Sequence, residues 1–188
     1  ADRGLNTSDN IYFLNGNNKC DYNTRDGYVY GQSVRGACEE FKKWVLGDGY
    51  TTTIIENDEG NEITFKHKSR IYPKELSVNT TTQSGNIKKC KVVVDQKQMI
   101  YYSEKYAAKQ RLDRDAMIER AKDLIRHPKN YDRVTCAGSA AYIKNIAFDK
   151  TSGLVVENRL LALDTKKIEE ESKYDGYYSI VTSELKMS

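Results

Sequence analysis

Residues 90–126 read CKVVVDQKQMIYYSEKYAAKQRLDRDAMIERAKDLIR and contain the point at which the character of the chain changes. Up to Tyr102 the segment is rich in β-branched and aromatic residues, which is typical of strands. From Ser103 onward the apolar residues recur at helical spacing, and Pro128 follows the last of them. We therefore predict strands before residue 103 and one long helix over 104–126.

The rest of the sequence predicts an α+β fold in which antiparallel strands dominate the middle of the chain. Segments 51–55 and 62–71 are rich in Thr and Ile and flank a turn sequence, which indicates a hairpin. A second strand pair is expected at 90–94 and 98–102, joined at Asp95-Gln96-Lys97. The other expected elements are helices over 5–15, 37–46, 138–146 and 164–173, and strands over 28–34, 154–163 and 177–182.

The composition argues against a membrane protein, a disordered chain and a small disulfide-linked or zinc-binding domain. The chain has 188 residues, with 30 Lys and Arg, 27 Asp and Glu and a net charge of +3. No run approaches the ~18 apolar residues of a membrane-spanning helix, and 14 tyrosines are too many for a solvated, disordered tail. The four cysteines are far apart and form no CxxC pair, so we expect reduced thiols in a cytoplasmic protein rather than a zinc site or a disulfide scaffold.

Few residues within the chain have the pattern of a catalytic site. The sequence contains no GxSxG, P-loop or GxGxxG pattern. His67 lies in a basic strand segment and His127 at the end of the long helix, and neither has a candidate partner nearby in the sequence. We therefore expect His67 at the surface and His127 in a favourable place at a helix C-terminus.

Basic residues gather in three stretches, at 66–74, 88–91 and 105–114. Uneven positive charge of this kind suits the phosphate backbone of a nucleic acid, and a solvated charged surface explains each stretch as well. Trp44, the single tryptophan, fits the hydrophobic core first and a stacking platform for an unpaired base second.

Arg114 conflicts with the helix that contains it, because it falls within the angular range of the apolar face. Two interpretations remain open at this point. Arg114 is buried and paired with a carboxylate from elsewhere in the chain, or the first two turns of the helix leave the core and present Gln110, Arg111 and Arg114 to a polyanion. The buried pair is slightly favoured.

Two terminal segments have a more specific pattern, ADRGLNT at 1–7 with Asn10-Ile11 after it, and KYDGYYSIVTSEL at 173–185. Together with Tyr106-Ala107, Arg111 and Arg114, they resemble the insertion-sequence transposases of the DDE type, in the fourth insertion-sequence family and its close relatives. The resemblance also accounts for a chain that begins Ala1-Asp2-Arg3-Gly4 without an initiator Met, as a piece of a longer protein would.

The resemblance implies a ribonuclease-H-like fold with three catalytic carboxylates and a large, mostly β insertion. By this mapping Asp2 is the second catalytic carboxylate and a metal ligand, the first lies upstream, and a catalytic Glu lies beyond Ser188. The implied division is a ribonuclease-H-like fragment at 1–16, the β-rich insertion domain at 17–163 and a second ribonuclease-H-like fragment at 164–188. Strand 177–182 would lie parallel to the strand that ends at Asp2 and would have an unpaired edge.

The implied activity is the cleavage of transposon ends and their transfer to target DNA. Two Mg²⁺ or Mn²⁺ ions about 4 Å apart would serve an in-line displacement at phosphorus, and one carboxylate alone does not hold them. The chain by itself is therefore expected to be inactive and to bind no metal ion.

The implied partner of the full-length enzyme is double-stranded DNA, at the transposon ends and the target, with a homodimer assembled on it in the bacterial cytoplasm. An alternative from another class is a non-enzymatic, β-rich nucleic-acid-binding module. The candidate DNA-contact residues are Trp44, Lys66, Lys68, Arg70, Lys88, Lys89, Lys109, Arg111 and Arg114.

Overall fold

The computed structural model describes residues 7–16, 26–56, 58, 60–81, 85–127, 138–145 and 161–186. The chain divides into two compact units. The first spans Ala1–Ser103 together with Tyr177–Ser188, and the second spans Glu104–Gly176. Each unit is described by itself below.

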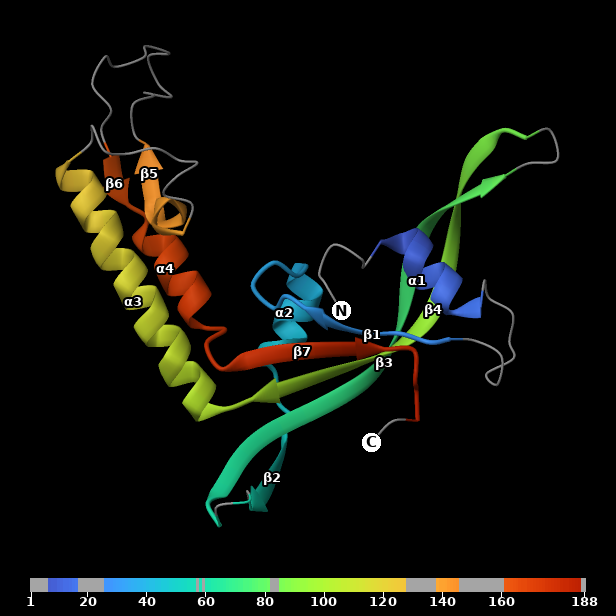
Figure 1. Cartoon of the computed structure of the whole chain (residues 1–188), viewed down its shortest axis with the longest axis horizontal. Helices are drawn as coiled ribbons and strands as arrows, with labels where there is room; N and C mark the ends of the chain where they lie inside the picture. Colours follow the sequence, from blue (N-terminus) through green and yellow to red (C-terminus); the bar gives the residue numbers. More distant parts are fainter. Residues whose placement is uncertain are drawn as a thin grey trace. The chain divides into compact units, whose positions relative to one another are not determined.

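The first unit is built on a five-stranded antiparallel sheet in the order β1-β7-β4-β3-β2 (Figure 1). Two helices, α1 and α2, complete this unit. The strands are β1 (Val29–Gln32), β2 (Thr51–Glu56), β3 (Glu62–Thr81), β4 (Ile87–Tyr102) and β7 (Tyr177–Thr182), and the helices are α1 (Ser8–Leu14) and α2 (Glu39–Leu46).

The β3–β4 hairpin is longer than the sequence predicts. Its ladder runs unbroken from the pair Lys66–Tyr102 to the pair Thr81–Ile87. The predicted break at Asp95-Gln96-Lys97 is therefore wrong. These residues keep the strand alternation, since Gln96 is buried while Asp95 is exposed, and a polar residue can occupy an inward position when it has a hydrogen-bond partner.

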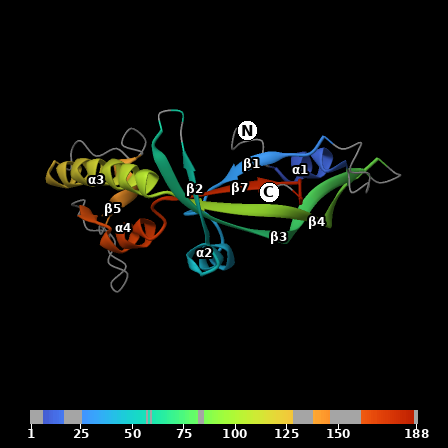
Figure 2. The same cartoon turned by 90° about the horizontal axis from the view of Figure 1, so that it is seen from below.

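Both helices lie against the sheet face that carries the even-numbered side chains of β3 and β4. Ile11 of α1 joins a core cluster with Leu76, Val78, Val94 and Val181. Figure 2 shows α2 on one side of the sheet. The Trp44 ring of α2 lies against Arg70 of β3. Thr7 caps α1, with its hydroxyl accepting from the Asn10 N–H at 3.2 Å.

Strand β7 lies inside the sheet, between β1 and β4. It pairs antiparallel with both neighbours, Val181 lying opposite Tyr30 on one side and Gln98 on the other. The expectations of an unpaired edge on strand 177–182 and of a parallel neighbour for it are therefore wrong, because antiparallel strands occupy both edges of β7. The neighbours on both edges give partners to the backbone N–H and C=O groups of β7, and Val181 and Thr182 are fully buried.

The second unit contains the long helix and a small two-stranded sheet. Helix α3 ends two residues before Pro128, as predicted. The expected helix over 138–146 is one 3₁₀ turn followed by a strand, and of the expected strand over 154–163 only the last three residues are described. The elements are α3 (Glu104–Arg126), η4 (Ser139–Tyr142), β5 (Ile143–Asn145), β6 (Leu161–Leu163) and α4 (Thr165–Ser172).

The structure confirms a mixed fold of helices and a mostly antiparallel sheet. The limits of the two compact units differ from the division at 1–16, 17–163 and 164–188, which stays a prediction. Among the described helices, none is long and apolar enough to cross a membrane.

Candidate nucleic-acid interface

The residues that the sequence nominates for DNA contact fall into a buried set and an exposed set. The buried set has partners within the chain, whereas the exposed set is open to a ligand. Lys68 and Arg114 are each 8% exposed, and Trp44 and Arg70 are half-buried. The exposed set consists of Lys66, Lys88, Lys89, Lys109 and Arg111.

Lys68 closes the C-terminal end of α2. Its Nζ donates to the carbonyl oxygens of Trp44, of Gly47 at 2.6 Å and of Asp48 at 3.1 Å. The last carbonyls of a helix have no partner within the helix, so a buried ammonium group satisfies them. Burial lowers the pKa of Lys68, and the nearby Asp48 carboxylate counteracts this. Lys68 is a structural residue and not an open phosphate ligand.

Arg70 is held by its own surroundings on the same sheet face. Its guanidinium carbon lies 4.3 Å from the ring centroid of Trp44 and 4.6 Å from that of Tyr72. Its Nε donates to Gln98 Oε1 at 2.8 Å, and a terminal nitrogen lies 3.2 Å from Glu40 Oε1. Trp44 therefore stacks on an arginine of the chain, and that contact occupies part of the surface that an unpaired base would need.

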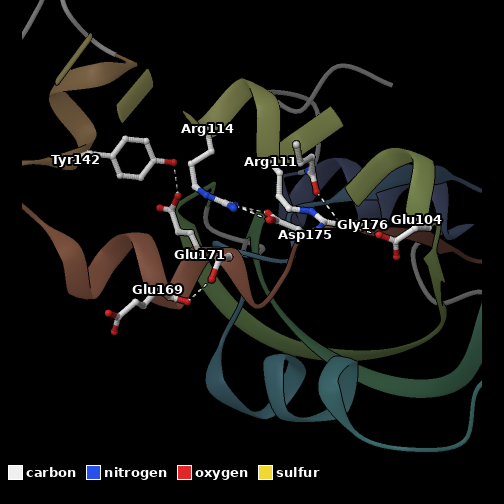
Figure 3. A network of polar contacts seen from close by, with 10 residues as sticks. Glu104, Arg111, Arg114, Tyr142, Glu169, Glu171, Asp175 and Gly176 are labelled. Atoms are coloured by element: carbon white, nitrogen blue, oxygen red, sulfur yellow. Dashed lines mark hydrogen bonds and ion pairs between the residues drawn. The ribbon is translucent and has the colours of Figure 1, made fainter. Parts of the chain in front are cut away.

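Arg114 and Asp175 form a buried ion pair in the second unit (Figure 3). The Arg114 NH1 donates to both carboxylate oxygens of Asp175, at 2.6 and 2.5 Å. Gln110 contacts the same turn, since its side-chain oxygen accepts from the Gly176 N–H at 2.8 Å. Of the two interpretations of Arg114, the structure confirms the buried pair, and Arg114 does not present its guanidinium to a polyanion.

The other basic residues of α3 that the sequence nominates are at the surface. Arg111 pairs with Glu104 over 2.5 Å, and both side chains are more than half exposed (Figure 3). An ion pair in solvent is worth at most about 1 kcal/mol, so it leaves Arg111 free to exchange partners. Lys109 is exposed as well.

A row of aromatic rings crosses the other face of the sheet, and the sequence analysis missed it. The ring centroids of Phe65 and His67 are 5.8 Å apart, those of His67 and Tyr101 6.2 Å, and those of Tyr101 and Tyr178 5.1 Å. His67 is half-buried rather than a plain surface residue, and its Nε2 lies 2.9 Å from the Thr53 hydroxyl. The sequence does show that Phe65 and His67 alternate along one strand. It does not show that Tyr101 and Tyr178 lie beside them, because that depends on the register of the neighbouring strands.

The row lies on the face opposite α1 and α2, as the odd-numbered positions of β3 and β4 require. Tyr178 is 39% exposed, and Phe65 and Tyr101 are half-buried. Burial raises the pKa of Tyr178, and the neighbouring Tyr101 raises it further. Side chains of this kind offer flat apolar surface for stacking at low conformational cost.

The predicted catalytic and metal-binding residue, Asp2, lies outside the described residues. Within the described ranges no three His, Cys, Asp or Glu side chains are grouped in a way that could hold a metal ion. Of the four cysteines, Cys38 and Cys90 are described, and both are free thiols. Comparison of the chain with protein-family models, with curated proteins and with solved structures found no match.

Proposed function

We propose that the chain is part of a DDE transposase that cleaves transposon DNA ends and joins them to target DNA. The proposal starts from the resemblance of segments 1–11 and 173–185 to that family. If the two segments belong to one catalytic core, residues near the two ends of the chain should pack together. The observation that carries the proposal is that Ile11, next to the first segment's motif, and Val181, within the second, share one core cluster.

Hydrogen bonds between Tyr28, just before β1, and Ser183, just after β7, fix the end of the second segment. The Tyr28 N–H donates to the Ser183 hydroxyl at 2.9 Å, and the Ser183 N–H donates to the Tyr28 carbonyl at 3.1 Å. Thr182 and Ser183, the Thr-Ser end of the second segment, are fully buried. These contacts hold the second segment within the sheet of the first unit, although the antiparallel pairing of β7 on both edges is not the parallel pairing that the resemblance implies.

The Arg114–Asp175 pair gives a physical reason for two further residues of the resemblance. Asp175 belongs to the Tyr-Asp-Gly stretch, and Arg114 is one of the two arginines of the long helix that accompany it. The two residues are expected to occur together, because either one without the other would be a buried, unpaired charge.

The metal ions of this proposal are not accounted for by the described residues. Asp2 is one of three carboxylates that a DDE enzyme requires, and no grouping of metal-ligating side chains occurs in the described part of the chain. The chain's own contribution in this proposal is to frame the carboxylate at Asp2 and to hold DNA.

The test uses the protein encoded by the whole reading frame that contains this chain, with a duplex that carries the DNA flanking that frame. We expect Mg²⁺-dependent nicking at the transposon end by the wild-type protein and none by Asp2→Asn. The matched control is Asp58→Asn, which changes an exposed turn carboxylate and should leave cleavage intact. Undiminished cleavage by Asp2→Asn, or no cleavage by the wild type, would refute the proposal.

A second candidate function is a non-enzymatic nucleic-acid-binding module, and the aromatic row favours it. Sheets that bind single-stranded nucleic acids place aromatic side chains on one open face, where bases stack on them. Phe65, Tyr101 and Tyr178 come from three adjacent strands and offer such a face. Binding of single strands without any cleavage of duplex DNA would favour this candidate over the transposase.

A further inference from the structure

The outer half of the β3–β4 hairpin is a two-stranded ribbon, and it consists of residues 72–81 and 87–96. Strand β2 pairs with β3 only over 62–67, and β7 pairs with β4 only over 97–102. Within the described part of the sheet, the ribbon therefore has no third strand. It is the green, twisted end of the hairpin in Figure 1.

The ribbon is anchored on one face, and its other face carries polar and basic side chains together with the exposed apolar side chains of Ile87 and Val93. Its even-numbered residues Leu76, Val78 and Val94 are buried in the core cluster with Ile11 of α1. Asp9 of α1 is also engaged, since its two carboxylate oxygens accept from the N–H and the side-chain amide of Asn79, both at 2.8 Å. The ribbon is thus held in place by packing that involves none of its lysines.

Four lysines against two acidic residues give the ribbon a positive charge. Lys88, Lys89 and Lys91 are exposed, and they lie directly opposite Thr80, Asn79 and Ser77 on β3. None of the three lysines therefore has a carboxylate at the directly opposite position on β3, the position from which a cross-strand ion pair forms most readily. Glu75 reaches Lys91 over 3.0 Å, but this pair is 59% and 77% exposed and therefore weak.

The three lysines are arranged to reach an extended polyanion. Lys89 and Lys91 project from the same face, roughly 7 Å apart at about 3.4 Å per residue, and Lys88 projects from the other. A two-stranded ribbon is also narrow enough to lie in the major groove of DNA. Lys68, Arg70 and Arg114 have partners in the chain. The exposed basic residues of α3 alternate with Glu104, Asp113 and Asp115, so the ribbon has the larger excess of positive charge.

We propose that the outer half of the β3–β4 hairpin binds the phosphate backbone of double-stranded DNA through Lys88, Lys89 and Lys91. The choice of duplex DNA as the polyanion rests on the proposed function. The contact is electrostatic and independent of base sequence, and it positions the duplex rather than reading it.

The test measures the affinity of the 188-residue chain for a short labelled duplex of arbitrary sequence at several salt concentrations. The ribbon variant carries Lys88→Gln, Lys89→Gln and Lys91→Gln. The control variant carries the same change at three exposed lysines elsewhere, Lys43, Lys166 and Lys186. Both variants lower the net charge from +3 to zero, so any effect of overall charge is the same in both.

We expect the slope of log K against log salt to fall by about 1 for each lysine lost from the ribbon, about 3 in all, and to stay near the wild-type value in the control. Equal loss in both variants, no loss in the ribbon variant, or no binding by the wild type would overturn the ribbon proposal. Cleavage by the whole protein is a separate readout. Ribbon-dependent binding without cleavage would leave this proposal standing and refute the transposase.

Discussion

Arg114 on helix α3 and Asp175 in the turn after α4 form an ion pair in which both side chains are 8% exposed. Replacing Asp175 with Ala leaves the guanidinium buried without its partner, which typically costs about 3–5 kcal/mol. We expect Asp175→Ala and Arg114→Ala each to lower the free energy of unfolding by this amount in urea denaturation. The double variant Arg114→Met/Asp175→Leu should recover most of the loss, because no unpaired charge remains.

The control for the buried pair is the exposed pair on the same helix. Arg111→Ala should change the free energy of unfolding by less than about 1 kcal/mol, because its partner Glu104 is solvated. If Asp175→Ala behaved like Arg111→Ala, the buried pair would not be the contact that fixes this turn against α3.

Lys68 and Lys66 lie two residues apart on β3 and provide a matched pair. Lys68→Met removes three hydrogen bonds from the end of α2, and the carbonyls left behind cost about 1–3 kcal/mol. Lys66→Met changes an exposed side chain and should be close to neutral in stability. Thermal unfolding of the two variants separates them, and equal melting temperatures would contradict the structural role of Lys68.

The sequence predicted most elements of the fold because their local signals were consistent. Helix α3 spans Glu104–Arg126, as predicted, and the switch from strand to helix at Ser103 is correct. The unbroken β4 was missed because Asp95-Gln96-Lys97 has the composition of a turn. Its continuation depends on pairing with Tyr72 and Pro73 across the hairpin, which is tertiary information.

The candidate site could be predicted only in part. The sequence identifies the lysines but does not rank them, since exposure separates Lys88 from Lys68 and exposure follows from packing. The conflict within the apolar face of α3 did identify Arg114 as unusual, but its partner lies 61 residues away and has no signal of its own. The aromatic row depends on register across three strands, which a single sequence does not specify.

Gly27 tests the junction of β1 and β7 that supports the shared core. Its φ is +70°, and a Cβ added there would lie 2.9 Å from the Ser183 hydroxyl oxygen. Gly27→Ala combines backbone strain with this clash, and we expect a loss of about 1–3 kcal/mol in urea denaturation. Gly49→Ala is the control, because Gly49 has a φ of +94° with no atom within 4 Å of an added Cβ. A loss no larger at Gly27 than at Gly49 would show that the junction tolerates the extra atom.

The environment of Tyr50 leads us to expect that the free energy of unfolding falls at alkaline pH. Its hydroxyl donates to the Val45 carbonyl at 2.6 Å, and burial, followed by the neighbouring Tyr177, raises the pKa of Tyr50 far above its ordinary value of 10.0. Above pH 10 the unfolded chain loses this proton while the folded chain keeps it. The folded state then binds more protons, so the free energy of unfolding falls as pH rises.

The Tyr50→Phe variant isolates this contribution. At pH 8 it should be less stable than the wild type by about 1 kcal/mol, the value of one hydrogen bond. Above pH 10 the difference should shrink. The unfolded wild-type chain gains stability there by releasing the Tyr50 proton, and the variant has no such proton to release. Urea denaturation at pH 8 and pH 11 measures both differences, and an unchanged gap would mean that Tyr50 ionises normally in the folded protein.

Tyr178 and Tyr106 are a matched pair for the aromatic row, since their side chains are 39% and 38% exposed. Tyr178 stacks on Tyr101 at an interplanar angle of 12°, whereas Tyr106 lies on helix α3 outside the row. If bases stack on the row, Tyr178→Leu should weaken the binding of oligo(dT) by about 1–3 kcal/mol, the typical value of one base–aromatic contact. Tyr106→Leu should leave the affinity unchanged. A fluorescence titration of each variant with oligo(dT) measures this difference, and an equal effect of both changes would remove the row as the binding surface, because tyrosine exposure alone would then account for the loss.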